Sequence, residues 1–378
     1  MKGPHFTLEP GHFLRHHWQR EPLLLRQAIP DFRSPLSPET LAGLAMEAGV
    51  ESRIIGHSEG VWALQHGPFT EEAFLRSDQW TLLVQAVDRL LPEVAALRHC
   101  VDFIPSWRFD DIMVSWAVDG GGVGPHFDRY DVFLLQGEGQ RLWRLGGRCD
   151  EDTARLEHDD LQLLQHFETV QEFLLNPGDV LYVPPGVAHW GIAQGPCMTF
   201  SLGFRAPPLT TLMARMADTV IEQLKPELLL EDRDSLQTVG RPGEITEQQR
   251  QNARDALINA ITHVDDGRWL GELVTELPVD DDPLIPVVAG AGSSAERILA
   301  PWIRLAWTEY ETHVTVFVAG HSLDIGKGAL PVVIALCAGH AVTLDAVQHG
   351  EDVDDLIEFL SGFEALIHPE LIHPEETP

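Results

Sequence analysis

Two histidines and one aspartate have the residue types and the spacing of a metal site. His126 and Asp128 stand two residues apart in the segment GGGVGPHFDRYDVF. Alternate side chains of a β-strand point to one face, so this imidazole and this carboxylate would point together. A second segment, GDVLYVPPGVAHW (178–190), reaches His189 after a Pro-Pro-Gly turn, which would place a third ligand on a neighbouring strand. Two imidazoles and one carboxylate leave open positions on a metal, as in the facial triad of non-haem Fe(II) oxygenases.

The alternative for each motif alone is an ordinary structural role. An H-x-D pair arises often by chance, and a single histidine is commonly just packed in a core. The combination is more specific, because both motifs lie among predicted strands and both are flanked by Gly or Pro turns. The sequence therefore predicts that His126, Asp128 and His189 are metal ligands of a catalytic site.

A triad of this kind needs an electron source to split dioxygen, and a bidentate keto acid could supply the electrons. Its distal carboxylate would need a cation on the barrel wall. Arg141 in RLWRL is the candidate, because a guanidinium makes paired hydrogen bonds to a carboxylate. Ser115 in MVSWAV could add a hydroxyl to the same carboxylate. The alternatives are a surface salt bridge for Arg141 and an ordinary strand serine for Ser115.

These five side chains lie in a part of the chain, 101–205, that consists of short β-rich runs separated by Gly and Pro. Many short strands with turns between them favour a sandwich or a barrel. Residues 1–100 are mixed: the spacing predicts a helix after Ser37-Pro38-Glu39 and further helix from Thr70 to Leu91. The fold class expected from this order is α+β.

The rest of the chain divides into two predicted modules. Residues 206–279 contain two amphipathic helices, one from Leu209 to Val220 and one from Ala253 to Val264. Such helices bury an apolar face against a second subunit or within the chain, and both remain open, with a homodimer favoured. After a linker at 280–295, the segment to residue 378 suggests a small winged-helix-like domain. Its expected elements are a helix from Ala295 to Tyr310, a strand pair in HVTVFVAGHSLDI, and helices at Pro331–Cys337 and Val353–Phe363.

The charge balance constrains the partners. The chain of 378 residues has 26 Lys and Arg against 58 Asp and Glu, a net charge of −32. Residues 266–378 contain 4 basic and 20 acidic residues. Contacts to phosphates need clustered cations, so we expect no direct DNA binding. A negative surface would steer a basic partner inward, although adaptation to salt explains the charge equally well.

Three features of the sequence bear on the cellular compartment and on insertion into a membrane. No stretch of 18 apolar residues is present, and the start MKGPHFTLEP has no apolar run typical of a signal peptide. The four cysteines are far apart, which argues against a disulfide framework. We expect a cytoplasmic protein that does not enter a membrane.

Several longer segments resemble a known family. They are FLRHHWQREPLLLR, LAGLAMEAGVESRII, the run from WRFDDIMVSWAVDGGG through VGPHFDRYDVFLLQGEGQRLWRLG, NPGDVLYVPPGVAHWGIA, and SLGFRAP. Together they resemble the JmjC-type 2-oxoglutarate/Fe(II) oxygenases of the cupin class, and within them the bacterial ribosomal oxygenases. The similarity is close over roughly residues 10–210 and extends beyond them in domain order only.

The resemblance implies a double-stranded β-helix (cupin/JmjC barrel) with flanking helices, within a catalytic domain at 1–205. It implies Fe(II), 2-oxoglutarate and dioxygen, with His126, Asp128 and His189 at the metal and with Arg141 and Ser115 at 2-oxoglutarate. It also implies a helical dimerisation module at 206–279 and a winged-helix-like domain at 280–378 that does not read DNA. The implied activity is hydroxylation of the β-carbon of an arginine in a basic protein of the large ribosomal subunit.

Other functions stay open on the sequence alone. A related oxygenase could act on a histidine of another ribosomal protein, on a different protein or on a small molecule. A metal-binding cupin could act without oxidation, and an adaptor could use the acidic surface only to hold a basic partner. Release of succinate that requires Fe(II) and 2-oxoglutarate would separate the oxygenases from the last two.

Overall fold

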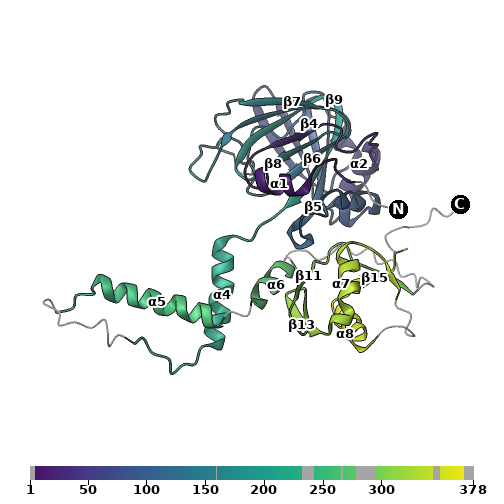
Figure 1. Cartoon of the computed structure of the whole chain (residues 1–378). Helices are drawn as coiled ribbons and strands as arrows, with labels where there is room; N and C mark the ends of the chain where they lie inside the picture. The colour runs from purple at the N-terminus through teal and green to yellow at the C-terminus, as the bar shows by residue number, and fades with distance from the viewer. Residues whose placement is uncertain are drawn as a thin grey trace.

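The computed structural model describes residues 5–158, 160–231, 242–264, 267–277, 295–343 and 350–369. A β-barrel with short helices on its outside forms the upper part of the molecule (Figure 1). Two long helices extend from it to one side, and a small mixed domain lies below it (Figure 1). Within the described ranges, no helix is both long and apolar enough to cross a membrane.

The barrel is built from one antiparallel sheet of nine strands, in the order β1-β8-β6-β9-β5-β4-β2-β3, with β7 also paired to β6. The two longest strands, β6 and β9, pair along most of their length. The register between β6 and β9 shifts from Gln136 to Gln140, where Gly139 has a φ of +61°. The barrel has two walls that face each other, and at this irregularity each long strand passes from one wall to the other. The strands are β1 (Leu23–Leu25), β2 (Ser52–Ser58), β3 (Val61–His66), β4 (Gln79–Val84), β5 (Phe109–Ala117), β6 (Asp131–Arg148), β7 (Gln171–Leu175), β8 (Val180–Val183) and β9 (Val187–Phe204).

Short helices close the outside of the larger wall. In α1 (Pro10–His16), Phe13 is buried and packs edge-on against Tyr182. In α2 (Pro38–Met46), Ser37 caps the first turn by accepting from the Thr40 amide, as expected from Ser-Pro-Glu. A third short helix, α3 (Pro92–Ala95), follows β4. The helix expected over 70–91 is wrong: Glu71–Phe74 and Val87–Arg89 form short 3-10 turns, and Gln79–Val84 form β4, whose side chains are buried from Trp80 onward.

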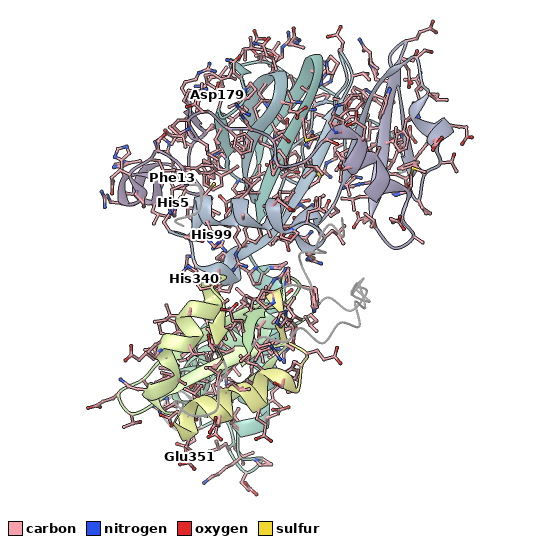
Figure 2. All side chains as sticks on the ribbon, turned by 90° about the vertical axis from the view of Figure 1, so that its right-hand side faces the viewer. His5, Phe13, His99, Asp179, His340 and Glu351 are labelled. Carbon is pink, nitrogen blue, oxygen red and sulfur yellow. The ribbon has the colours of Figure 1, made fainter. Side chains whose placement is uncertain are left out.

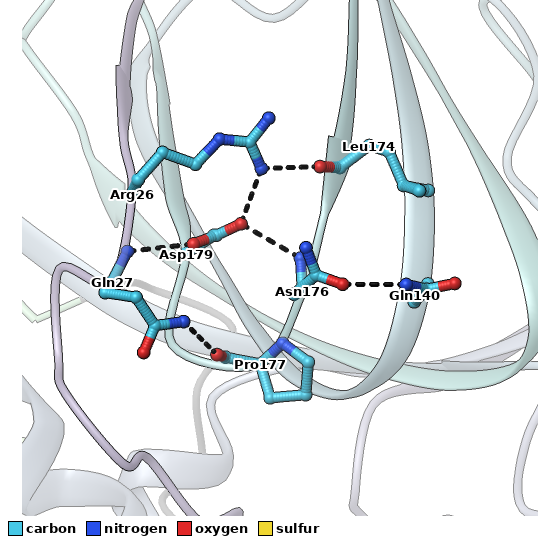
Figure 3. A network of polar contacts seen from close by, with 7 residues as sticks. All are labelled: Arg26, Gln27, Gln140, Leu174, Asn176, Pro177 and Asp179. Carbon is cyan, nitrogen blue, oxygen red and sulfur yellow. Dashed lines mark hydrogen bonds and ion pairs between the residues drawn. The ribbon is translucent and has the colours of Figure 1, made fainter.

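A buried carboxylate joins the N-terminal segment to the barrel (Figure 3). Asp179 accepts from Nη1 of Arg26 at 2.6 Å and from the backbone amides of Gln27 and Asn176 at 2.8 and 3.0 Å. The Asn176 side chain in turn accepts from Nε2 of Gln140 at 2.7 Å. The turn between β7 and β8 is thereby held against the part of β6 that precedes Arg141.

The two predicted helices after residue 206 are present as α4 (Leu209–Gln223) and α5 (Glu247–Val264). Their apolar residues are mostly not buried within the chain. Leu209, Met213 and Leu257 are 82%, 61% and 66% exposed, whereas Val220 is buried. Residues 232–241, most of the expected connecting loop, lie outside the described residues.

The C-terminal part has its own core. Helix α6 (Arg268–Thr275) packs against the sheet β11-β12-β13, with Gly271 directly over the Phe317 ring. The expected strand pair and both later helices are confirmed. The elements are β10 (Glu296–Leu299), β11 (Leu305–Glu309), β12 (Val314–Val318), β13 (His321–Ile325), α7 (Leu330–Cys337), β14 (Val342–Thr343), α8 (Glu351–Ser361) and β15 (Leu366–Ile367).

The helix expected from Ala295 to Tyr310 is wrong. This segment forms two strands, β10 and β11, on either side of a turn that contains Pro301. A proline inside a helix removes a hydrogen bond and clashes with the preceding turn, so it separates the segment into two short pieces that find partners in different sheets. The expected linker at 280–295 lies outside the described residues, except for Ala295.

Candidate metal centre

The backbone brings the two histidines together. His126 and His189 form an isolated antiparallel bridge, with amide-to-carbonyl distances of 3.1 Å from His126 and 2.8 Å from His189. His189 lies on β9, as expected, but the H-x-D segment is not a full strand, because β6 begins only at Asp131. The potential ligand atoms of His126, Asp128 and His189 all lie within 4.8 Å of one another. The structure therefore assembles the predicted group of two imidazoles and one carboxylate.

Both imidazoles are oriented by backbone carbonyls. The Nδ1 atom of His126 lies 2.9 Å from the carbonyl of Gly124, and Nδ1 of His189 lies 3.0 Å from the carbonyl of Val187. Only a protonated ring nitrogen can donate to a carbonyl, so Nδ1 carries the proton in each ring and Nε2 keeps its lone pair. Burial, together with His126, lowers the pKa of His189 to about 4, and a neutral imidazole is the form that binds a metal.

Glycines permit the close approach of the segments around the group. A Cβ on Gly122 would lie 2.3 Å from the carbonyl oxygen of Gly191, and a Cβ on Gly191 would lie 2.8 Å from the Trp143 ring. Gly186, with a φ of +78°, closes the Pro-Pro-Gly turn and donates its amide to the carbonyl of Asp128 at 2.8 Å. The turn thus holds the backbone of the carboxylate ligand candidate.

The predicted pair Arg141 and Ser115 meets inside the barrel. Nη1 of Arg141 on β6 donates to Oγ of Ser115 on β5 at 3.2 Å, and both residues are buried, at 3% and 2% exposure. Nε and Nη2 of Arg141 are buried without a hydrogen-bond partner among the described residues. Buried donors nearly always have partners, so the two unpaired guanidinium nitrogens suit an anionic group with two acceptor oxygens. A carboxylate fits this requirement.

Trp143 lies between this receptor and the histidines. Its ring centroid is 5.8 Å from the guanidinium carbon of Arg141 and 5.9 Å from the centroid of the His189 ring. The alternation in RLWRL predicted that Trp143 shares a face with Arg141, and the structure agrees. Arg144, on the other face, pairs with Glu172 outside the barrel. The position of Trp143 against His189 was not predictable from spacing.

The other acidic and aromatic residues near the site have partners in the chain. Tyr130 lies beside Asp128, and burial together with that negative charge raises the pKa of Tyr130. Asp110 pairs with Nε of Arg205 at 2.5 Å and with Nη2 of Arg304 at 2.7 Å. Asp111 accepts from Nε2 of Gln85 and the amide of Ala86, at 2.6 and 2.9 Å. Both carboxylates therefore hold the protein together at the end of β5.

Comparisons with known proteins agree with this geometry. A family model described as the JmjC domain matches residues 96–212. Ribosomal protein uL16 3-hydroxylase of Escherichia coli (strain K12) is 39% identical over 271 residues, 71% of this chain and 72% of that protein. A probable ribosomal oxygenase of Haemophilus influenzae is 35% identical over 263 residues, 68% of this chain and 65% of that protein.

Solved structures extend the similarity along the chain. The structure of YcfD, a ribosomal oxygenase from Escherichia coli, matches with a TM-score of 0.77 and 31% identity, over 97% of this chain and 99% of that chain. A structure of YcfD in complex with cobalt and 2-oxoglutarate matches with the same TM-score and identity, over 96% and 99%. The chain belongs to the JmjC-type ribosomal oxygenases and is a 2-oxoglutarate-dependent dioxygenase that uses Fe(II).

Proposed function

We propose that His126, Asp128 and His189 bind the Fe(II), each through one atom. The observation that carries this assignment is the convergence of their ligand atoms within 4.8 Å, with Nδ1 of each histidine turned to a backbone carbonyl. Three protein ligands on one face leave room for a bidentate keto acid and for dioxygen. The backbone bridge between the histidines keeps two of the ligands in place before the metal binds.

We propose that 2-oxoglutarate places its distal carboxylate on Arg141 and Ser115. The unpaired Nε and Nη2 of Arg141 supply two donors, and the Ser115 hydroxyl supplies a third. A buried charge-assisted pair of this kind fixes the orientation of the keto acid as well as its affinity. Trp143 forms a flat wall between the carboxylate receptor and His189, so it would contact the keto acid along its length.

We propose that the substrate is a basic protein of the large ribosomal subunit and that the hydroxylated atom is the β-carbon of an arginine. Support comes from the 39% identity to a protein named uL16 3-hydroxylase. The net charge of −32 would attract a basic protein. More distant relatives, such as the protein of Aedes aegypti at 25% identity over 191 residues, are named histidyl-hydroxylases, so a histidine target is the alternative.

The residues of the chain would divide the work as follows. Fe(II) with 2-oxoglutarate and dioxygen supplies the oxidising power that inserts one oxygen atom into a C–H bond, with release of succinate and carbon dioxide. Arg141 and Ser115 hold the keto acid in one orientation. Val132, Leu134 and Leu145, with Trp143, form a buried apolar wall that excludes bulk water from the reacting centre. The protein binds, orients and shields, and the target carbon is selected by where the peptide docks.

We also propose the roles of the remaining modules. Residues 1–205 would form the catalytic domain, with its β-helix core at about 101–205. Helices α4 and α5, in the 206–279 module, would form a homodimer, because their apolar faces are largely exposed in the single chain. Leu257→Glu would then shift the protein to monomers in sedimentation experiments.

Residues 280–378 would form a winged-helix-like domain that does not bind DNA, given the acidic balance of this region. A cytoplasmic location follows from the proposed substrate.

Mass spectrometry tests the proposed reaction directly. The purified protein is incubated with Fe(II), 2-oxoglutarate and recombinant uL16, and the substrate is fragmented to locate added oxygen. One oxygen atom on an arginine side chain, absent with His126→Ala, supports the proposal. Oxygen on a histidine supports the alternative, and succinate release without an oxidised protein would contradict both. The same measurement on ribosomal proteins from cells with and without the gene tests the substrate in vivo.

A further inference from the structure

A cavity of about 220 Å³ lies between the barrel and the C-terminal domain, away from the metal ligands. Figure 2 shows this junction, where the labelled His99 of the barrel part lies across from His340 of the C-terminal part. His99 lies within 3.4 Å of where a Cβ on Gly339 would stand, so the two parts are in contact there. The cavity has a mostly apolar wall, formed by Val101, Ile104, Phe109, Phe204, Trp307 and Ile334.

One cation faces this apolar space. Arg98 lines the cavity, and its guanidinium carbon lies 5.3 Å from the centroid of the Phe109 ring. Among the described residues, Arg98 has no hydrogen bond and no ion pair. Burial lowers the pKa of Arg98, while the charges of Asp88 and Asp102 act in the opposite direction. Arg98 is half-buried, so its guanidinium lies at the cavity without a direct partner among the described residues and can pair with an anionic ligand.

The nearby carboxylates are committed elsewhere. Asp102 accepts from Nδ1 of His99 at 3.1 Å, and Asp88 accepts from the amide of Ile112 at 2.7 Å. A narrower crevice of about 20 Å³ shares Arg98, Ser106 and Phe109 with the cavity. At its far side Asp110 is held by two other arginines. The polar side chains on this cavity are those of Arg98, Asp102, Ser106 and Cys337, and among the described lining residues Arg98 carries the positive charge.

We propose that this junction cavity binds a small organic monoanion, with its carboxylate on Arg98 and Ser106 and its ring or short chain between Phe109, Trp307 and Ile334. An apolar cavity of about 150 Å³ holds benzene, so about 220 Å³ accommodates a ring and a carboxylate. A phosphate fits less well, because a single guanidinium, an apolar wall and the charge of Asp102 all disfavour a dianion. Because the ligand would contact both domains, its binding would stabilise their association.

The binding of 4-fluorobenzoate tests this proposal. Its dissociation constant is measured by fluorine NMR on the full-length protein, loaded with Co(II) and saturating 2-oxoglutarate so that Arg141 is occupied. The neutral analogue 4-fluorobenzamide has nearly the same shape. We expect 4-fluorobenzoate to bind at least tenfold more tightly than the amide, and to raise the melting temperature.

Variants locate the site. Arg98→Met removes the charge and keeps an apolar chain, and Ala338→Phe fills the cavity from the end of α7. Each variant should raise the dissociation constant of 4-fluorobenzoate at least tenfold. Circular dichroism verifies that each variant is folded. Arg144→Met is the matched control, because it removes one surface arginine outside the cavity, and it should bind like the wild type. Absence of binding, equal binding of acid and amide, or unchanged binding in both cavity variants would overturn the proposal.

Discussion

Arg141 on β6 donates to Ser115 on β5 across the inside of the barrel, at 3.2 Å, while its other two buried nitrogens have no partner among the described residues. These parts of β5 and β6 belong to opposite walls of the barrel, so the hydrogen bond joins the two walls. It lies next to Trp143, whose ring in turn packs against the ring of His189. A carboxylate that joined them would extend toward the histidines. This relationship connects the proposed cofactor site with the proposed metal site.

Removal of the Arg141 guanidinium should weaken the binding of 2-oxoglutarate far more than removal of the Ser115 hydroxyl does. Arg141 would give the carboxylate two hydrogen bonds and Ser115 one, and each hydrogen bond to a charged group contributes about 1.5–3 kcal/mol. We expect Arg141→Ala to raise the KM for 2-oxoglutarate roughly 100-fold or more, and Ser115→Ala about tenfold. Succinate release at varied 2-oxoglutarate measures both. An unchanged KM in Arg141→Ala would show that the carboxylate binds elsewhere.

Removal of one imidazole should largely abolish metal binding. Even the outer partners of metal ligands typically contribute 10–100-fold to affinity, so a direct ligand contributes more. We expect His126→Ala and His189→Ala each to weaken Co(II) binding by at least about a hundredfold, measured by calorimetry. His313→Ala, in the C-terminal domain near Asp324, is the control and should bind Co(II) normally. Normal affinity in either site variant would contradict the triad.

A methyl group added at Gly191 should displace Trp143 and thereby disturb the position of His189. The added Cβ would lie 2.8 Å from the Trp143 ring, which packs against His189, so the ring must move within a filled interior. Overpacking of this kind costs about 1–3 kcal/mol. We expect Gly191→Ala to lower the melting temperature and the affinity for Co(II). Gly147→Ala, whose Cβ would meet nothing within 4 Å, should change neither.

The buried carboxyl of Asp88 should make stability depend on pH. Burial and the charge of Asp111 raise the pKa of Asp88 from 3.8 to about 7. Between these values the unfolded chain releases a proton that the folded chain retains, so stability falls as the pH rises toward 7. The side chain in Asp88→Asn does not ionise, so this variant should not lose stability as the pH rises. Its amide oxygen can still accept the hydrogen bond from the backbone amide of Ile112.

The melting temperatures of Asp88→Asn and wild type should therefore diverge with pH. We expect the advantage of the variant to grow from pH 5 to pH 7.5 and to reach about 1–4 kcal/mol at the upper end. Thermal unfolding of both proteins across this range measures it. A difference that stays constant with pH would show that Asp88 ionises normally in the folded protein.

The acidic surface should act on the rate of encounter with a basic substrate. Attraction between a protein of net charge −32 and a basic protein is screened within about 8–10 Å at ordinary ionic strength. We expect kcat/KM for uL16 to fall several-fold as salt rises from low to physiological concentration, with little change in kcat. An insensitive kcat/KM would favour salt adaptation as the reason for the charge.

The local motifs anticipated which side chains lie together, because each motif carries its own geometry. Two-residue spacing brought His126 and Asp128 to one side, and alternation in RLWRL separated Arg141 and Trp143 from Arg144. The turn before His189 was recognisable from Pro184-Pro185-Gly186. The wrong helices, at 70–91 and at Ala295–Tyr310, arose where apolar residues fit a helical period by chance and where strand partners far along the chain decided the outcome.

The sequence by itself determined which groups could bind a metal and a keto acid, because residue type and short-range spacing are local properties. Only the tertiary structure decided that His126 pairs with His189, that Arg141 faces Ser115 with two nitrogens unpaired, and that Arg98 lines a cavity between domains. These relationships depend on the register of strands and on the packing of domains distant in the chain. Such contacts are selected by the burial of the whole core rather than by any one segment.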